Sequence, residues 1–373
     1  MPIRALTISL LILAFVLSGS VVSASSIDRR LETSFSTYIE NTAQTIYSMK
    51  VDLIHPLSER FGFGTALGVD AISGATPSKN IDESEDDESE NDESSTRVYP
   101  SLRLMYDDGD NIGDLGGYYS TETDYTGKSV FADYTRVMNL GNTAAGVSAV
   151  QSYDIWGIEG LNPDRREERT VSLTLSQTLS ERSQARLVWS NFHSEGYLGN
   201  PYRFIDFGVT RILERLPESR DGDALALKFV TLLGDPTSLH VSYRYYSDDW
   251  SISSHTIDTT LYKDISPRWT LGGRLRGYTQ SAADFVKPIA DIAQTDSVIA
   301  IDYRYSSFDS YMAGMEFLYQ PRDRVGKLLD WGRAKVKGGL GLYTTSSNDF
   351  IQYWYGEGSI TGITGTISLE YDY

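Results

Sequence analysis

Apolar and polar residues alternate along short segments throughout this chain of 373 residues. In SLHVSYRY, residues 238–245, every second residue is apolar or aromatic, and the residues between carry a hydroxyl, an imidazole or a charge. Because successive side chains of a strand point to opposite faces, this segment predicts a strand with one apolar and one polar face. The same alternation occurs in TVSLTLS (170–176), WTLGGRLRG (269–277), YMAGMEFLY (311–319) and GITGTISLEYDY (362–373).

Two kinds of connection separate these strands. Short turns occur at HPLSER, DDGDN, LGNT, LSERSQ, LGDPTS, KDISPR and, slightly longer, QPRDRVGKLLD. Longer connections alternate with them around residues 73–96, 156–168, 197–221, 281–307 and 345–360. Outer-membrane barrels have short periplasmic turns and long outer loops. We therefore predict an all-β fold, a transmembrane antiparallel up-and-down β-barrel of about sixteen strands.

A secreted β-sandwich or propeller would also show alternation and is the competing prediction. The 25 tyrosines and 6 tryptophans favour a barrel, because aromatic side chains form girdles at both membrane interfaces. The last strand ends in the aromatic Tyr373, which looks like the assembly signal of outer-membrane proteins. Closure would also pair every backbone group of the sheet, as lipid requires.

The first residues have the pattern of a secretory signal peptide. Arg4 precedes the apolar run from Ala5 to Leu17, and VVSA then supplies small residues at a cleavage site after Ala24. This run is shorter than the roughly 20 apolar residues of a membrane-spanning helix. We predict a signal peptide at 1–24 and a barrel at 25–373, exported to the outer membrane, where its partners are lipid and the barrel assembly machinery.

Charge and cysteine content exclude several classes of function. The formal net charge is -18 and the pI is about 4.6, which argues against nucleic acid as a partner. The chain has no cysteine, so neither thiolate metal sites, disulfides nor c-type haem attachment is available. We predict no cofactor and no metal.

No catalytic constellation is recognisable in the sequence. It contains no HExxH, GxSxG or P-loop motif. His193, Ser194 and Glu195 are adjacent, but neighbours in a strand point to opposite faces, so Ser194 cannot readily use His193 as a base. We predict that the protein is not an enzyme.

An acidic insert interrupts the regular pattern. NIDESEDDESENDESST carries nine carboxylates between Asp82 and Glu93 and no basic residue. Like charges at this density repel each other, and the acidic run has no apolar residues to bury. A disordered loop is therefore predicted at about 78–96. Weak binding of divalent cations is the functional alternative, without the spacing of a dedicated calcium loop.

Charged residues recur on the polar face, which in a barrel of this size lines the lumen. A sixteen-stranded barrel encloses an aqueous channel unless something fills it, and charged rings select ions. The candidate lumen-lining residues are Arg244, Arg274, Arg276, Arg103, Lys335, Lys337 and Glu316. The three arginines 244, 274 and 276 either attract anions or pair with Glu316 or Asp258 and brace the wall; the sequence leaves both open.

Four stretches carry a resemblance to a known family: SGATP (73–77), SEGYLGNPYR (194–203), YRYYSDDWSISSHT (243–256) and YTQSAADF (278–285). Together they look like the bacterial family called domain of unknown function 3570, over nearly the whole mature chain. The resemblance implies an outer-membrane barrel of unresolved activity. Family members are often encoded near a small lipoprotein and a periplasmic flavin transferase, which implies extracytoplasmic redox work.

The stretch GNPYR is a strand end followed by a turn, because Asn before Pro is biased away from helix. Asn200, Pro201, Tyr202 and Arg203 are the candidate loop motif, either as support for the barrel rim or, for Arg203, as a ligand contact.

From the sequence we therefore expect a porin-like channel or conduit for small solutes or ions. The first alternative is a barrel component of a flavin-linked electron-transfer system that docks a periplasmic redox protein or a small lipoprotein. The second is a structural barrel with an occluded lumen.

Overall fold

A computed structural model describes residues 27–42, 44–73, 95–156, 164–200, 204–206, 211–234, 236–321 and 333–373. The predicted signal peptide and most of the predicted acidic loop lie outside these residues. The prediction of a loop to residue 96 is wrong at its end, because Ser95 and Thr96 already pair with β3 as the first residues of β4.

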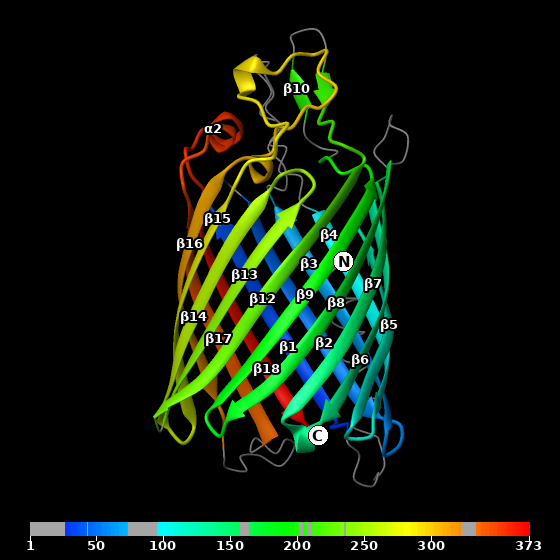
Figure 1. The fold of residues 1–373 in the computed structure, drawn as a ribbon, viewed down its shortest axis with the longest axis vertical. Helices are drawn as coiled ribbons and strands as arrows, with labels where there is room; N and C mark the ends of the chain where they lie inside the picture. The colour runs from blue at the N-terminus through cyan, green and yellow to red at the C-terminus, as the bar shows by residue number, and fades with distance from the viewer. Residues whose placement is uncertain are drawn as a thin grey trace.

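The chain forms a closed antiparallel barrel of sixteen strands, which confirms the predicted fold class and strand number (Figure 1). Each strand pairs with its neighbours in sequence, except that β9 pairs with β12. The barrel strands are β1 (Arg30–Glu40), β2 (Thr45–Pro56), β3 (Phe61–Ser73), β4 (Ser95–Asp107), β5 (Asn111–Thr121), β6 (Tyr125–Met138), β7 (Thr143–Trp156), β8 (Asp164–Ser180), β9 (Ser183–Gly196), β12 (Ser219–Gly234), β13 (Thr237–Asp248), β14 (Ser253–Ser266), β15 (Trp269–Gln280), β16 (Phe308–Tyr319), β17 (Ala334–Thr345) and β18 (Thr361–Asp372).

The remaining elements are short and lie in the connections. They are the 3-10 turns η1 (Asn139–Gly141), η2 (Ile289–Asp291) and η3 (Tyr303–Tyr305), the ribbon of β10 (Phe204–Asp206) and β11 (Arg211–Leu213), and the helix α2 (Asp349–Tyr355). The sequence did not predict α2. No helix in the described part of the chain is long and apolar enough to cross a membrane.

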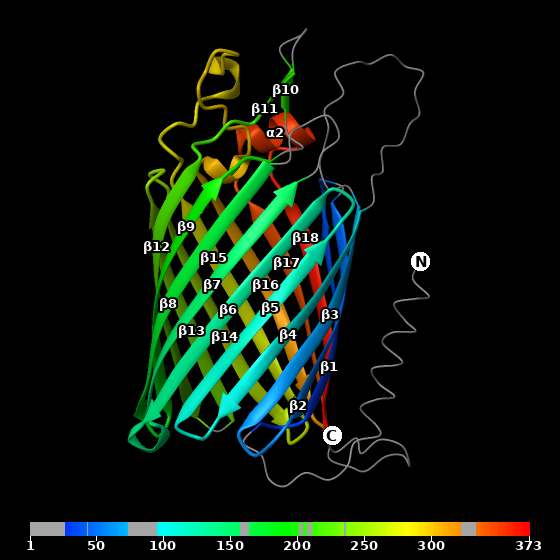
Figure 2. The same ribbon diagram turned by 90° about the vertical axis from the view of Figure 1, so that its right-hand side faces the viewer.

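The two ends of the barrel differ as predicted. The predicted short turns lie at the end where the chain finishes, and the long connections lie at the other end, together with short turns at 41–44, 122–124 and 249–252 (Figures 1 and 2). We name these the periplasmic and outer ends, because outer-membrane barrels have short periplasmic turns. Two further predicted boundaries are wrong: β8 begins at Asp164, so residues 164–168 extend that strand, and β12 begins at Ser219, so residues 219–221 do not belong to the long connection before it.

Alternation separates a lipid-facing surface from the lumen. Leu275, Met315 and Leu340 face outward and are 66, 67 and 68% exposed, which is the apolar surface that lipid would cover. Aromatic side chains edge this band: the rings of Trp269 and Tyr319 lie 4.6 Å apart at its periplasmic edge. Together these residues form the apolar band and aromatic girdle typical of a membrane barrel.

The first and last strands close the barrel. β1 and β18 pair over the length of β1, from Arg30 opposite Asp372 to Glu40 opposite Gly362. The terminal Tyr373 stacks on His55, with ring centroids 6.3 Å apart, and its hydroxyl lies 3.1 Å from His55 Nδ1. The terminal aromatic side chain is therefore fixed against the second strand at the periplasmic end.

Candidate functional site

The seven candidate lumen residues all lie on the inner face of the wall. Arg244 alternates with the exposed Tyr243 and Tyr245, and Arg274 and Arg276 flank the outward-facing Leu275. The others, Arg103, Glu316, Lys335 and Lys337, lie at the inward positions of β4, β16 and β17, where their ion pairs join them to other inward side chains.

Most of these charges are neutralised within the wall. Arg274 donates to Asp258, with Nη2 2.6 Å from Oδ2, and its Nη1 lies 3.7 Å from Glu316. Lys335 and Lys337 bind the two oxygens of Glu370 at 2.7 and 2.8 Å. Such pairs brace neighbouring strands and leave little charge for a solute in the lumen to meet.

Arg103 has a weaker partner. Its guanidinium lies 3.7 Å from a carboxylate oxygen of Asp52, which also lies 3.5 Å from the ammonium of Lys50. Asp52 is therefore shared between two cations. Arg103 belongs with the wall braces rather than with the free charges.

Arg244 and Arg276 differ from the other candidates. Among the described residues neither has a carboxylate within 4 Å, and both side chains are exposed to the lumen. Arg244 lies over the ring of Tyr246, 5.2 Å from its centroid, which holds the guanidinium without neutralising it. The strand β14 separates the two arginines, so they form a cationic patch on one wall.

The pairing of Arg274 rather than Arg276 is not what strand register alone predicts. Asp258 lies directly opposite Arg276 across β14 and β15. Its carboxylate nevertheless bonds to Arg274, the diagonal neighbour, because long side chains reach diagonal positions and Arg274 has Glu316 on its other side. The carboxylate of Glu316 therefore determines that Arg274, and not Arg276, forms the ion pair with Asp258.

Within the described residues, the opposite wall carries carboxylates without a close ion pair that the sequence analysis missed. β5 lies eight strands from β15 in the ring of sixteen, so the two strands face each other across the lumen. Asp114 on β5 lies opposite Asp133 on β6, and neither has a cation within 4 Å in the described chain. Oδ1 of Asp114 is buried without a hydrogen-bond partner. The inward alternation of these strands was the signal that could have found them.

Three clusters of Asp, Arg and Tyr strengthen the outer third of the lumen wall, and they too were missed. In each, an aspartate near the outer end of a strand accepts hydrogen bonds from an arginine of one strand and from a tyrosine hydroxyl. The clusters are Asp70 with Arg97 and Tyr99, Asp154 with Arg166 and Tyr125, and Asp248 with Arg220 and Tyr246. Each joins at least two strands, and these arginines are therefore not free in the lumen.

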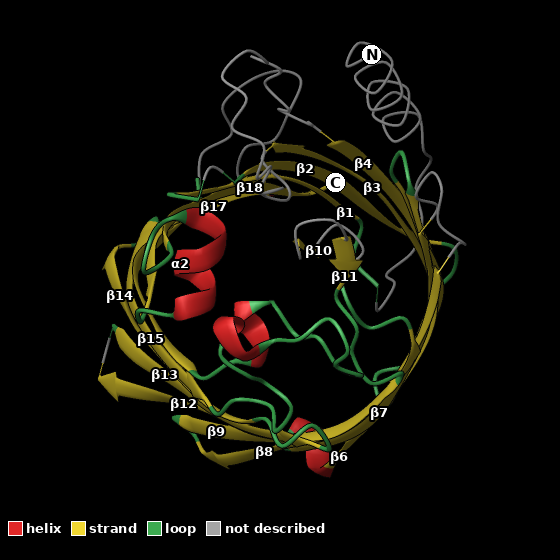
Figure 3. Ribbon diagram, turned by 90° about the horizontal axis from the view of Figure 1, so that it is seen from above, coloured by secondary structure: helices red, strands yellow, loops and turns green. Residues whose placement is uncertain are grey.

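Three long connections pack together over the outer mouth of the barrel (Figures 1 and 3). We call residues 197–218, 281–307 and 346–360 the outer cap, in its described part. Ile299 and Ile301 of one connection pack against Trp354 of another, and the indole of Trp354 donates to the carbonyl of Ile301 at 2.7 Å. The cap is thus a packed unit with its own small apolar core.

A buried carboxylate fastens two of these connections. Glu214 is fully buried and accepts the backbone N–H of Asn200 at 2.8 Å, of Ile301 at 3.0 Å and of Asp302 at 3.2 Å. Burial, with the nearby carboxylates of Glu214 and Asp302, raises the pKa of the Tyr305 phenol. A buried anion requires such partners, so these bonds fix the connections relative to each other.

The candidate loop motif lies at the edge of this cap. Asn200 donates its backbone N–H to Glu214 within the same connection. Pro201, Tyr202 and Arg203 lie outside the described residues.

The helix α2 is tied to the same cap by Asn348, the residue that precedes it. Asn348 accepts the N–H of Phe350 with its side-chain oxygen and donates to Ser306 Oγ at 2.6 Å. It therefore caps the helix and links two connections at once. Phe350, Ile351 and Trp354 are the buried residues of the helix, and Gly356 ends it in the left-handed conformation.

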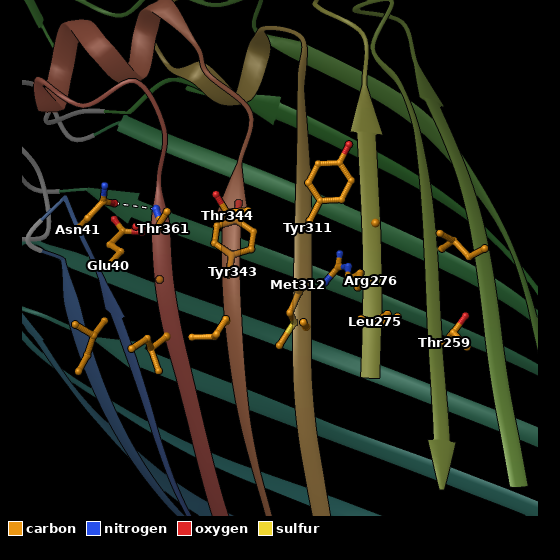
Figure 4. Close-up of a pocket in the computed structure, with 17 residues that line it drawn as sticks. Glu40, Asn41, Thr259, Leu275, Arg276, Tyr311, Met312, Tyr343, Thr344 and Thr361 are labelled. Carbon is orange, nitrogen blue, oxygen red and sulfur yellow. Dashed lines mark hydrogen bonds between the residues drawn. The ribbon is translucent and has the colours of Figure 1, made fainter. Parts of the chain in front are cut away.

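One apolar groove lies outside the lumen, on the lipid-facing side of β14 to β18 and β1 (Figure 4). Ile257, Leu275, Tyr311, Leu342 and Ile363 line it. These five residues belong to the apolar band that faces lipid, so the groove is a dent in the membrane surface of the barrel; the inward-pointing Arg276 also contributes to its lining.

His193 and Ser194 lie on opposite faces of β9, as the alternation predicted. His193 faces outward and bonds Asp221 with Nδ1 at 2.8 Å, whereas Ser194 faces inward and donates to Glu168. No group of three or more His, Cys, Asp or Glu side chains within the described ranges could hold a metal ion.

Comparison with solved structures places the fold among bacterial outer-membrane barrels. A structure titled bacterial polysaccharide outer membrane secretin is 7% identical, with a TM-score of 0.54, and covers 95% of this chain and 100% of its own. A loop-deletion mutant of OmpT of Vibrio cholerae is 10% identical, with a TM-score of 0.49, over 94% and 99% of the two chains. The siderophore receptor PirA of Pseudomonas aeruginosa is 9% identical, with a TM-score of 0.45, and the chain spans 57% of its length. At these identities the likeness concerns the fold alone.

No curated protein matches the sequence. A family described as protein of unknown function (DUF3570) matches residues 149–348. Three of the four resembling stretches fall within this range; SGATP lies before it, so the match is narrower than the nearly whole chain that the sequence suggested. The match covers more than half of the chain, which belongs to the DUF3570 family.

Proposed function

We propose that the protein is an outer-membrane channel for small polar solutes with a preference for anions, and not an enzyme. The observation that carries this proposal is the free cationic pair Arg244 and Arg276, in a lumen where the other candidate cations are paired. Unpaired charge in a narrow polar channel acts on passing ions, whereas paired charge acts mainly on the wall.

The carboxylates on the opposite wall support a transverse field. Asp114 on β5 faces the strand that carries Arg276, although it lies closer to the periplasmic end. A solute that carries both charges would align between the two walls. The proposal includes export by a signal peptide at residues 1–24, insertion by the barrel assembly machinery and location in the outer membrane.

Two variants and a planar bilayer test the proposal. Replacing both arginines, Arg244→Ala with Arg276→Ala, should lower the anion-to-cation permeability ratio about fivefold, because a close charge contact in water is worth about 1 kcal/mol. The reversal potential in a salt gradient measures the ratio. The wild-type preference should weaken as salt rises, since the Debye length is about 10 Å at 0.1 M.

A matched control is available on the outer surface. Arg169 faces outward on β8, is exposed and has no carboxylate within 4 Å among the described residues. Arg169→Ala removes one positive charge without changing the lumen and should leave the reversal potential unchanged. If the double variant behaves like this control, Arg244 and Arg276 do not set the selectivity and the proposal fails.

An occluded barrel is the second candidate, favoured by the outer cap. The connections of the cap are packed and hydrogen-bonded over the mouth. Wild-type protein that inserts into the bilayer but shows no conductance would favour this candidate over the channel. The redox alternative rests on the family resemblance alone.

A further inference from the structure

A recess in the inner wall begins near the periplasmic end of the lumen and extends to Met312, the residue opposite Arg276; neither Arg244 nor Arg276 lines it. Its volume is about 740 Å³, and residues of β13 to β18 and β1 line it. Ser238 and Thr270, which line it, are the second residues of β13 and β15, so the recess lies just inside the periplasmic turns. Its size falls in the range of about 300 to 1,000 Å³ that is usual for ligand sites.

Glycines on two neighbouring strands open the recess. At Gly339 a Cβ atom would lie 3.4 Å from the hydroxyl oxygen of Thr366, so a side chain there would cover this hydroxyl. At Gly314 a Cβ atom would lie 2.9 Å from the carbonyl oxygen of Leu340, too close for any other residue. The wall is therefore thin at these positions, and the space in front of Thr366 stays open.

Hydroxyl groups line the recess in register. Ser34 and Ser36 on β1 lie opposite Ser368 and Thr366 on β18, and Thr364 is the next inward residue along. None of these five hydroxyls has a hydrogen-bond partner in another residue of the described chain. Each hydroxyl can donate one hydrogen bond and accept two, so the five hydroxyls offer a ligand both donors and acceptors.

The charges at the edge of the recess are already balanced. Arg274 is held by Asp258 and Glu316, and Lys337 by Glu370. Glu32 adds a carboxylate to the lining. The recess therefore offers an anion no free cation, in contrast to the cationic patch.

An aromatic pair completes the lining. The rings of His240 and Tyr262 meet edge to face, with centroids 4.9 Å apart, and the Tyr262 hydroxyl bonds Glu316. Rings beside hydroxyls suit a ligand that has both C–H faces and hydroxyl groups.

We propose that this recess binds a neutral polyhydroxylated solute, an oligosaccharide in chemical class. Sugar hydroxyls need donors and acceptors together, which the Ser and Thr row and the paired Arg274 and Glu316 supply. The site goes beyond the proposed anion preference and does not depend on it, since it needs only access from one end of the lumen.

Titration calorimetry with maltotriose tests the site, on the purified full barrel in a polyoxyethylene detergent whose head group is not a sugar. Wild-type protein should bind maltotriose, and the dianion glutarate should bind more weakly. Gly339→Leu fills the recess and should weaken maltotriose binding by at least roughly tenfold, or about 1.4 kcal/mol.

The matched control is Gly273→Leu on β15. A Cβ atom at Gly273 has nothing within 4 Å, and this position faces lipid, so maltotriose affinity should not change. If Gly339→Leu does not fold, as judged by heat-modifiable migration, the double variant Ser36→Ala with Thr366→Val takes its place and should weaken binding roughly tenfold, because it removes two hydroxyls.

Three results would overturn the proposal: no heat from maltotriose with folded wild-type protein at millimolar concentration, equal affinity in the folded recess variant, or tighter binding of glutarate. Failure here is distinguishable from failure of the channel proposal. The recess variants should keep the wild-type reversal potential, and Arg244→Ala with Arg276→Ala should keep maltotriose binding.

Discussion

The two ends of the barrel are held by different means. At the periplasmic end the strands join through short turns, and the terminal Tyr373 docks on His55 of a neighbouring strand. At the outer end long connections fold onto one another through an apolar core and the buried carboxylate of Glu214. Backbone pairing thus determines one end, and side-chain packing the other. We therefore expect that the outer end can loosen while the barrel stays closed.

The largest effect is expected at the periplasmic end. Deleting residues 371–373 removes the docked ring of Tyr373 and the pairing of Tyr371 with Leu31 and Ala334. The deletion shortens the pairing of β18 with both β1 and β17, so we expect almost complete loss of folded, membrane-inserted protein. Heat-modifiable migration of membrane fractions measures this.

Tyr373→Phe serves as the control, because it keeps the ring and removes only the hydroxyl. It should insert normally. Normal amounts of folded truncated barrel would show that the terminal aromatic residue is incidental.

A smaller, local effect is expected at the outer end. Glu214→Ala leaves the backbone N–H groups of Asn200, Ile301 and Asp302 without their acceptor. Losing charge-assisted hydrogen bonds in a buried site should lower the free energy of local opening by about 3 kcal/mol. Hydrogen exchange in the cap should accelerate on the order of 100-fold, while exchange in the strands stays the same.

Glu181→Ala, in the exposed turn between β8 and β9, is the matched control and should change neither region. If Glu214→Ala instead unfolds the barrel, the outer end is not stabilised independently of the barrel strands.

The smallest effect is expected from alkaline pH. Burial raises the pKa of Tyr303 and Tyr305, so the folded cap favours their neutral phenols. The resulting stabilisation of the folded cap is complete below about pH 10, the ordinary pKa of tyrosine. It is lost as the pH rises toward the pKa that these phenols have in the folded state. Acrylamide quenching of tryptophan fluorescence should therefore increase modestly above pH 10, mainly through Trp354 of the cap and through Trp250, whose ring packs 5.8 Å from that of Tyr305.

Tyr305→Phe removes one of these titrations and should move the onset to higher pH. An onset that does not move, or one that coincides with loss of the β-sheet signal, would show that the cap does not respond separately.

Local alternation was sufficient to predict much of this fold. A barrel strand turns one face to lipid and the other to the lumen, so its residues alternate with period two over its whole length. The strands, their two faces and the inward position of Arg276 therefore follow from neighbouring residues. The regular turn chemistry gave the strand count in the same way.

The outer cap and the free charges could not be predicted in this way. Whether Arg274 or Arg276 pairs with Asp258 depends on Glu316, which lies 42 positions after Arg274 and 40 after Arg276. The burial of Glu214 depends on backbone groups near residue 301. Both follow from contacts between segments distant in sequence, for which periodicity contains no information.

The pairing of β1 with β18 has a consequence for how the chain folds. Arg30 cannot meet Asp372 until the whole polypeptide is available, so the contact that completes the sheet is also among the most distant in sequence. Folding rates fall as contacts become more distant, because the loop must close before the contact is made. Until then β1 and β18 are open edges, each able to pair with another chain. The protein therefore depends on protection from aggregation for as long as its two terminal strands remain apart.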